Sequence, residues 1–335
     1  MSHNNNNHNN KEPIRIGLAG NPNAGKTTIF NALTGSRQRV ANYSGVTVEK
    51  KEGTRTYQDR ELIIYDLPGT YSLTAYSIDE VVARDFILDE KPHVIIDVID
   101  STNIERNLFL CLQFQELGIP VVGALNISDQ AEEMGIFIQE ENLSKILGIP
   151  MIKTVGSKGI GIDKLLDKVL ELESQGFEKS QRTLFYGLEL EAEVAKITQL
   201  LSQDPKFVHT YPARWVAIKL LEKDKHATLK LEDTQIKEAV LNQVQKSIGV
   251  IEKHFGSDAE IVVSEQRYAY VHGAAMEGVK RAEKSGAKTT EAIDKVLLNR
   301  VLGLPIFLFI LWGIFQITFT IGEYPLEWTE DFFAW

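Results

Sequence analysis

Residues Gly20-Asn21-Pro22-Asn23-Ala24-Gly25-Lys26-Thr27 form the phosphate-binding pattern G-x-x-x-x-G-K-[ST]. An apolar run over residues 14–19 precedes them and a helix-like segment over 28–33 follows them, which is the context that the pattern needs. The glycines let backbone N–H groups surround the phosphates, and the start of the helix, at Thr28, adds its positive dipole end. We expect Lys26 to contact the β- and γ-phosphates and the Thr27 hydroxyl to bind Mg²⁺.

A second motif, Asp66-Leu67-Pro68-Gly69, ends another predicted strand. There the carboxylate can hold Mg²⁺ and Gly69 can donate its N–H to a γ-phosphate. Between the two motifs lies the polar stretch 38–49, which contains Gly45-Val46-Thr47. Thr47 is a candidate to complete the coordination of Mg²⁺ when the γ-phosphate is present. These residues indicate a site for a nucleoside triphosphate with magnesium.

Two further strand ends carry residues suited to a purine base. Asn126-Ile127-Ser128-Asp129 follows one strand, and the Asp129 carboxylate can accept both guanine N–H groups, which adenine does not offer. Gly156-Ser157-Lys158 follows the last strand, where backbone N–H groups can receive the guanine oxygen. The pattern therefore favours GTP and GDP over ATP.

The spacing of apolar residues predicts an α/β domain followed by an all-helical domain. Up to residue 175, short apolar runs alternate with amphipathic segments, which is typical of a mostly parallel sheet, here six-stranded, with helices on both faces. The predicted strands are residues 14–19, 50–57, 61–66, 93–99, 120–126 and 149–154, with a hairpin of 50–57 and 61–66 at one edge. Capping boxes at Ser77-x-x-Glu80 and Thr102-x-x-Glu105 predict two helix starts. Beyond residue 176 the segments 188–202, 215–222, 233–255 and 264–284 have helical spacing and almost no strand signal.

The C-terminal part contains one long uncharged run, residues 301–321. At ~1.5 Å per residue, a helix of about 20 residues matches the ~30 Å hydrocarbon core of a bilayer, so we expect a transmembrane helix. Basic residues precede the run and acidic ones follow it, which by the positive-inside rule places the preceding domains in the cytosol. We expect this span to open a membrane domain that continues beyond Trp335.

The predicted organisation has six parts. They are a disordered polar tail over residues 1–12, a GTP-binding domain over 13–175, a helical regulatory domain over 176–284, a basic juxtamembrane linker over 285–300, the transmembrane helix over 301–322 and an acidic, aromatic interfacial segment over 323–335.

The five motifs, in this order along the chain, resemble those of the small G-protein class. Ile127 stands where that class has a lysine, so the stem that stacks on the base is lost and we expect a modest affinity for guanine. More specifically, residues 20–28, 45–49, 66–73 and 302–307 resemble the FeoB family of ferrous iron transporters. The resemblance implies a cytosolic G domain and a helical domain, likened to a nucleotide-dissociation inhibitor, ahead of an iron-conducting domain in the cytoplasmic membrane. Its partners would then be GTP, membrane lipid and, through that membrane domain, Fe(II).

The expected catalytic residues are Lys26, Asn23, Thr47 and Gly69. Many G proteins orient the attacking water with a glutamine shortly after the second motif, but residues 70–73 are Thr-Tyr-Ser-Leu, so we expect slow intrinsic hydrolysis. The resemblance implies that Asn23, with backbone carbonyls near Asn42 and Tyr43, binds a K⁺ ion that stands in for an arginine finger. Asn23 can equally be a turn residue that follows Pro22.

Composition restricts the competing functions. The net charge of −10 offers no basic footprint for nucleic acid, which disfavours a GTPase that acts on RNA. The single cysteine, Cys111, lies in an apolar run and is expected to pack in a core in a reducing compartment. A membrane-anchored signalling GTPase without a transport role is the alternative that stays open. The number of copies in an assembly stays open as well, and a homo-oligomer is among the candidates.

Overall fold

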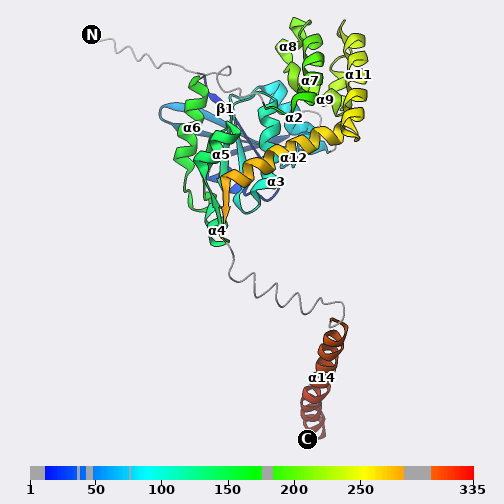
Figure 1. Cartoon of the computed structure of the whole chain (residues 1–335). Coiled ribbons are helices and arrows are strands. Elements are labelled where there is room, and N and C mark those ends of the chain that lie inside the picture. Colours follow the sequence, from blue (N-terminus) through cyan, green and yellow to red (C-terminus); the bar gives the residue numbers. More distant parts are fainter. Residues whose placement is uncertain (1–11, 36–37, 43–47, 75–76, 176–183, 283–302) are drawn as a thin grey trace, which may run out of the picture. The chain divides into compact units, whose positions relative to one another are not determined.

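The structure is a computed structural model that describes residues 12–35, 38–42, 48–74, 77–175, 184–282 and 303–335 (Figure 1). It consists of two units, Met1–Arg281 and Ala282–Trp335, and each is described by itself. The predicted polar tail and the predicted basic linker lie almost entirely outside the described residues.

A seven-stranded sheet forms the centre of the first unit, in the order β2-β3-β4-β1-β5-β6-β8. The strands β1, β4, β5, β6 and β8 run parallel, and β3 is antiparallel to both β2 and β4. Their bounds are β1 Ile14–Gly20, β2 Gln38–Asn42, β3 Glu49–Tyr57, β4 Arg60–Asp66, β5 Val94–Asp100, β6 Val121–Asn126 and β8 Met151–Lys153.

Helices cover both faces of this sheet. Successive side chains of a strand point to opposite faces, so Ile14, Ile16 and Leu18 of β1 pack with α1 (Lys26–Thr34) and α6 (Ile162–Gln175). Ile95 and Ile99 of β5 belong to the opposite core, with α2 (Ile78–Glu90), α3 (Ile104–Glu116) and α5 (Glu140–Leu147). The mostly parallel α/β architecture predicted from apolar spacing is confirmed.

The predicted number of strands is wrong, because the sheet has a seventh strand, β2. Its sequence, Gln-Arg-Val-Ala-Asn, is short and mostly polar, and it pairs only with β3 at the edge of the sheet. An edge strand with little buried surface needs no alternation of apolar and polar residues, so it is hard to recognise from the sequence. The predicted hairpin exists as β3 and β4, but β2 forms the edge outside it.

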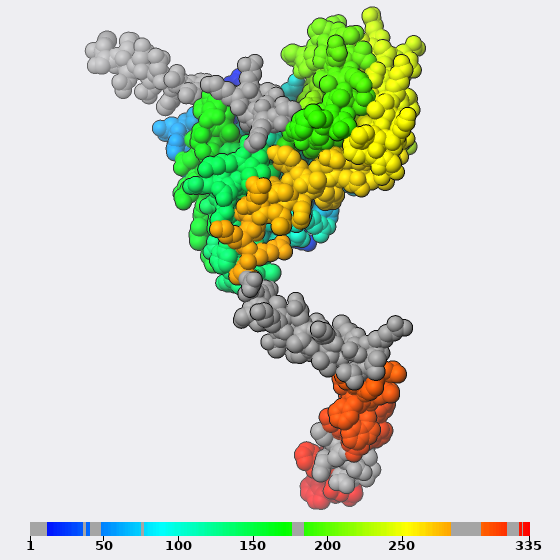
Figure 2. All heavy atoms as spheres, in the orientation of Figure 1, coloured from blue at the N-terminus to red at the C-terminus, as the bar shows by residue number. Residues whose placement is uncertain are grey.

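The helical domain follows α6 and shares its core with the α2/α3 face of the sheet. Its helices are α7 (Leu188–Leu201), α8 (Pro205–Thr210), α9 (Ala213–Leu221), α10 (Lys225–Leu229), α11 (Lys237–Phe255) and α12 (Ala259–Gly278). Figures 1 and 2 show α12, in orange, crossing the surface of the sheet domain, where it packs along α3 and α5.

Two of the predicted helix boundaries are corrected. The helix predicted over residues 264–284 ends at Gly278, because β9 (Val279–Arg281) pairs with β7 (Ile136–Ile138) and ties the helical domain back to the sheet domain. The predicted capping box at Ser77 is present. The one at Thr102 is not, because Asp100 accepts the Thr102 N–H at the start of a short turn, η1 (Ser101–Asn103). The helix α3 therefore begins only at Ile104.

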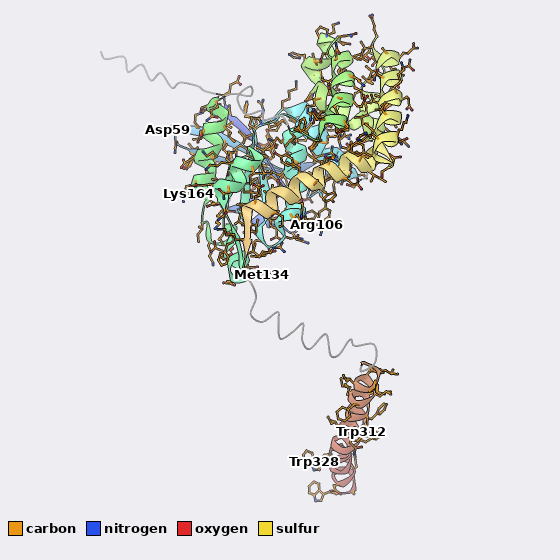
Figure 3. All side chains as sticks on the ribbon, viewed as in Figure 1. Asp59, Arg106, Met134, Lys164, Trp312 and Trp328 are labelled. Carbon is orange, nitrogen blue, oxygen red and sulfur yellow. The ribbon has the colours of Figure 1, made fainter. Side chains whose placement is uncertain are left out.

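The second unit contains the long helix α14 (Gly303–Ala334), on which Figure 3 marks Trp312 and Trp328. Across the part of the chain that the structure describes, no helix has the apolar length that crossing a membrane requires. The transmembrane helix predicted over 301–322 is thus not found among these residues, and residues 301–302 lie outside them.

Candidate nucleotide-binding site

The predicted nucleotide motifs meet at one edge of the sheet. The loops that carry them follow the carboxyl ends of β1, β4, β6 and β8, which lie at the same edge because these strands are parallel. Crevices at this edge of an open α/β sheet are the usual places for nucleotides.

The loop between β1 and α1 can be built only with glycine at two positions. Gly20 has φ +150° and a Cβ there would lie 2.5 Å from the Val98 carbonyl oxygen, while Gly25 has φ +83° and a Cβ would lie 2.3 Å from Asn126 Nδ2. Gly25 is also the N-cap of α1 and provides no side-chain cap, so the first N–H groups of α1 are available to an anion. The loop therefore fits a phosphate.

Lys26 and Asp66 form an ion pair at the centre of the site. Lys26 begins α1 and Asp66 ends β4, and their side chains are 14% and 9% exposed. A nearly buried carboxylate at the end of a strand, close to a phosphate-sized loop, suits Mg²⁺, which prefers oxygen ligands and keeps several waters. The Thr27 and Thr28 side chains are exposed on the first turn of α1.

The loop after β4 lies against the phosphate loop. A Cβ on Gly69 would be 3.5 Å from Pro22, and the Thr70 N–H lies 3.4 Å from the Gly20 carbonyl oxygen. Leu67 is buried in the α2/α3 core and its N–H donates to the Leu18 carbonyl, so its side chain does not face the site. Asn23 is exposed, with φ +67°.

Asn126 joins two loops of the site. Its Nδ2 donates to the Ala24 carbonyl at 2.9 Å, and its Oδ1 accepts the Gly156 N–H at 3.0 Å. The side chain is 3% exposed, so both hydrogen bonds are buried. Sequence reasoning assigned Asn126 to the base, and the structure places it between the phosphate loop and the loop at Gly156. Only the three-dimensional proximity of these loops reveals this role.

Asp129 and Lys158, both from the motifs predicted to bind the base, form an ion pair. Lys158 Nζ lies 2.7 Å from Asp129 Oδ2, and this contact lowers the pKa of Asp129 and raises the pKa of Lys158. Asp129 lies in α4 (Ser128–Glu133), whose N-cap is Ile127 with φ +59°, and Lys158 lies in the turn η2 (Gly156–Lys158). The Ser128 hydroxyl donates to the Thr154 carbonyl at 3.1 Å and holds α4 to the end of β8.

For some of the predicted residues the structure shows no contact within the site. Gly45, Val46, Thr47 and Tyr43 lie outside the described residues. Asn21 is placed in the loop with its side chain 3% exposed, and neither of its polar side-chain atoms has a hydrogen-bond partner among the residues described. The pattern match at position 21 allowed any residue, so nothing in the sequence singled it out.

Comparison with known proteins gives consistent matches along the first unit. The family described as "Ferrous iron transport protein B" matches residues 14–169, and the family described as "FeoB cytosolic helical domain" matches residues 186–280. The chain is 39% identical over 327 residues to a "Fe(2+) transport protein A/Fe(2+) transporter FeoB fusion protein" of Porphyromonas gingivalis. It is 37% identical over 314 residues to the "Fe(2+) transporter FeoB" of Escherichia coli. The matches cover 96% and 92% of this chain, but only 39% of the length of each relative.

Solved structures show the same similarity. A GDP-bound NFeoB mutant of S. thermophilus has 36% identity and a TM-score of 0.71, covering 80% of this chain and 100% of that one. The cytosolic domain of a T. maritima FeoB iron transporter in its GMPPNP form has 33% identity and a TM-score of 0.67, covering 80% and 99%.

Proposed function

This chain belongs to the FeoB family, of which it holds the N-terminal G domain and the cytosolic helical domain, and we propose from this that it binds GTP, hydrolyses it slowly and thereby switches Fe(II) uptake. The uptake would be carried out by a longer transporter in the cytoplasmic membrane, with these two domains on the cytosolic side. The length of the relatives, of which this chain spans 39%, supports such a continuation.

The observation that carries the proposal is the convergence of the motifs. Lys26 and Asp66 touch, and Asn126 links the phosphate loop to the loop that carries Lys158. Four loops that are distant in sequence thus come together, with the phosphate loop at one end and Asp129 at the other. GDP and GMPPNP in the solved relatives support the same nucleotide here.

The chemistry follows from the charges. The phosphate loop and Lys26 would stabilise the negative charge that develops on the γ-phosphate, and the N–H of Gly69 would contact the same group. Thr27, Asp66 and Thr47 would hold Mg²⁺, which neutralises charge on the phosphates when it is bound. Residues 70–73 offer no glutamine to orient water, which supports a slow switch.

Asn23 provides a test of cation assistance. Its exposed position in the phosphate loop leaves the amide available to a K⁺ ion beside the phosphates. If K⁺ supplies the positive charge that an arginine finger supplies elsewhere, K⁺ will raise the hydrolysis rate of the parent protein ~10-fold or more over Na⁺. We expect Asn23→Ala to lose this response, while Asn142→Ala, an exposed asparagine of α5, keeps it. Equal K⁺ responses in the parent and in Asn23→Ala would rule the cation role out.

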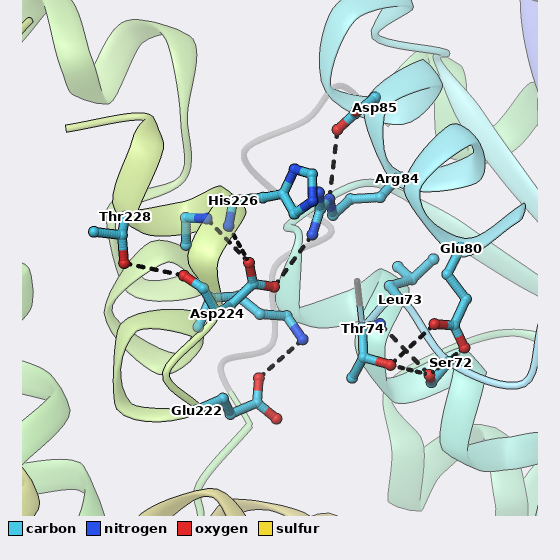
Figure 4. A network of polar contacts seen from close by, with 12 residues as sticks. Ser72, Leu73, Thr74, Glu80, Arg84, Asp85, Glu222, Asp224, His226 and Thr228 are labelled. Atoms are coloured by element: carbon cyan, nitrogen blue, oxygen red, sulfur yellow. Dashed lines mark hydrogen bonds and ion pairs between the residues drawn. The ribbon is translucent and has the colours of Figure 1, made fainter. Parts of the chain in front are cut away.

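Contacts between the two domains support a relay from the nucleotide to the rest of the protein. Figure 4 shows Arg84 of α2, the helix that follows the loop at Gly69, with its Nη1 3.2 Å from Oδ2 of Asp224. Asp224 is also the N-cap of α10, since its Oδ1 accepts the His226 and Ala227 N–H groups. Arg84 is 1% exposed, so the pair is shielded from water and a shift of α2 would be felt in the helical domain.

The switching role predicts an effect of Lys26→Ala on iron uptake by the intact transporter. Without Lys26 the site would lose most of its affinity for GTP, so uptake should no longer respond to GTP supply. The measurement is Fe(II) uptake by cells that produce the full-length protein, compared with Lys164→Ala, an exposed lysine of α6 away from the motifs. If Lys26→Ala abolishes GTP binding and leaves uptake unchanged, the switching role is wrong and a signalling GTPase is the better reading.

A further inference from the structure

Side chains from two helices hold the loop that follows Gly69 at four successive residues. The Arg106 guanidinium lies 4.2 Å from the centre of the Tyr71 ring, and the Leu73 N–H donates to Oε1 of Gln113 at 2.5 Å. Glu80 of α2 accepts hydrogen bonds from the Ser72 hydroxyl at 2.8 Å and the Thr74 hydroxyl at 3.1 Å, as Figure 4 shows. The loop 70–74 is therefore clamped on one side by α2 and on the other by α3.

The two α3 residues of this clamp share one stripe of the helix. Arg106 and Gln113 are seven residues apart, and with ~3.6 residues per turn they lie on nearly the same side of α3. Gln113 is fully buried, so its side chain has no freedom to follow the loop if the loop moves. The amide oxygen of Gln113 thus binds the backbone of the loop, while its Nε2 has no hydrogen-bond partner among the described residues.

The neighbouring stripe of α3 is fixed on α12. Oε1 of Glu105 lies 2.7 Å from Nδ1 of His272, and the rings of Phe109 and Tyr268 stack at 4.5 Å between centroids. Glu116 accepts hydrogen bonds from Nε and Nη2 of Arg267 at 2.7 and 2.9 Å.

The Glu116–Arg267 pair makes this attachment costly to break. Both side chains are almost fully buried, and Glu222 is a second carboxylate bound to the same guanidinium. Separating such a pair leaves a buried charge without compensation, which strongly opposes any movement of α3 relative to α12. The helix that holds the loop is therefore itself held by the helical domain.

We propose that Gln113 and Arg106 are positioning residues for GTP hydrolysis: they fix the loop 70–74 so that Gly69 and the attacking water meet the γ-phosphate in one geometry. The proposal rests on the GTPase activity proposed above. It explains how a loop without a catalytic glutamine stays ordered, because its backbone and its aromatic residue are anchored to α3 instead.

The exposed half of the clamp is tested by a double-mutant cycle. We expect Arg106→Ala and Tyr71→Ala each to lower kcat by about two- to fivefold, in line with an exposed cation–π contact, and the double variant to lose no more than either one. Tyr71→Phe keeps the ring and should keep kcat. Lys164→Ala is the matched control for loss of an exposed positive charge, and Figure 3 labels Lys164 on α6 and Arg106 on α3. KM for GTP and the affinity for GDP should stay unchanged in all of these variants.

The buried half is tested with Gln113→Leu and Gln113→Glu. Leucine has no acceptor for the Leu73 N–H and should lower kcat by ~10-fold, because a buried donor is left without a partner. Glutamate keeps an acceptor oxygen and should restore part of the rate. If the leucine variant does not fold, the Arg106 cycle still decides the matter.

The outcomes separate this proposal from the one on which it rests. If the parent protein hydrolyses GTP and the Arg106, Tyr71 and Gln113 variants all match its kcat, the clamp is refuted and the GTPase stands. If kcat falls only in proportion to a loss of folded protein, the contacts are structural and the clamp is likewise refuted. A parent protein that does not hydrolyse GTP would overturn both.

Discussion

Replacing Asp129 by asparagine will convert the protein from a guanine-nucleotide binder into a xanthine-nucleotide binder. The Asp129 carboxylate would accept two N–H groups of guanine, whereas an asparagine amide offers a donor where xanthine has a carbonyl oxygen. Hydrogen bonds to a charged group contribute about 1.5–3 kcal/mol each, and asparagine loses one of the two while keeping a neutral oxygen for the other, so the affinity for GDP should fall by roughly 10- to 10³-fold.

The change is isosteric and should leave the fold intact. Asp129 is 31% exposed, and its contact with Lys158 is an exposed ion pair that contributes little to stability. Asp59→Asn is the control, because Asp59 is exposed in the turn between β3 and β4 (Figure 3) and adopts φ +58°, which asparagine tolerates. Titration with fluorescent GDP and XDP is the measurement. An Asp129→Asn variant that keeps parental GDP affinity would show that this carboxylate does not read the base.

Replacing Asp97 by asparagine will stabilise the protein at and above neutral pH. Asp97 lies in the middle of β5 with 1% of its side chain exposed, and its Oδ2 has no hydrogen-bond partner among the described residues. Burial raises its pKa to about 7, and the hydrogen bond from Cys111 opposes this rise. Cys111 is itself buried, as its apolar sequence context predicts.

The pH dependence has a definite sign. The pKa of Asp97 is higher in the folded state than its value of 3.8 in the unfolded chain. Its contribution to the stability of the folded state is therefore complete below pH 3.8, and it is lost as the pH rises towards 7. A pKa difference of about three units means that ionised Asp97 costs ~4 kcal/mol of stability. Asparagine avoids this cost, but its own buried, unpaired amide cancels part of the gain.

We therefore expect Asp97→Asn to gain about 2–3 kcal/mol in free energy of unfolding at pH 8. At pH 4 the gain should be absent. Urea unfolding at both pH values measures this difference, with Asp89→Asn, an exposed carboxylate of α2, as the control. A variant whose advantage over the parent is the same at both pH values would contradict the raised pKa of the buried Asp97.

The central part of the fold is predictable because its signals are local. The buried runs of β1, β4, β5 and β6 are nearly continuous in apolar residues, as strands covered on both faces must be. The phosphate loop is equally legible, since the positions of Gly20 and Gly25 admit no Cβ. In both cases the requirement, burial on both faces or the absence of a Cβ, falls on the residues whose identity shows it in the sequence.

Elements defined by distant partners were missed or misjudged. The strand β9 is formed from Val279, Lys280 and Arg281, which look like a continuation of α12, and only pairing with β7 makes them a strand. The start of α3 moved because Asp100, rather than Thr102, provides the side-chain oxygen for the first turn. From residue 303 the apolar run is part of the longer helix α14, and no transmembrane span was found among its described residues.

In the candidate site, too, some features were predictable from the sequence and others were not. The position of Lys26, Asp66 and Asp129 at one edge of the sheet was predictable, because each lies at or shortly after the end of a predicted strand. The links between them were not, since Asn126 joins residues more than a hundred positions apart in the chain, and Gln113 reaches Leu73 from another helix. Such contacts depend on the packing of the whole sheet, which no single motif encodes.

The most direct test of the account is the release of phosphate from GTP and from ATP by the full chain under single-turnover conditions with Mg²⁺. We predict slow hydrolysis of GTP, no measurable hydrolysis of ATP, and inhibition of the GTP reaction by GDP but not by ADP. Equal hydrolysis of ATP and GTP, or no hydrolysis of GTP in the presence of Mg²⁺ and K⁺, would contradict the assignment of this chain as a GTP-hydrolysing switch.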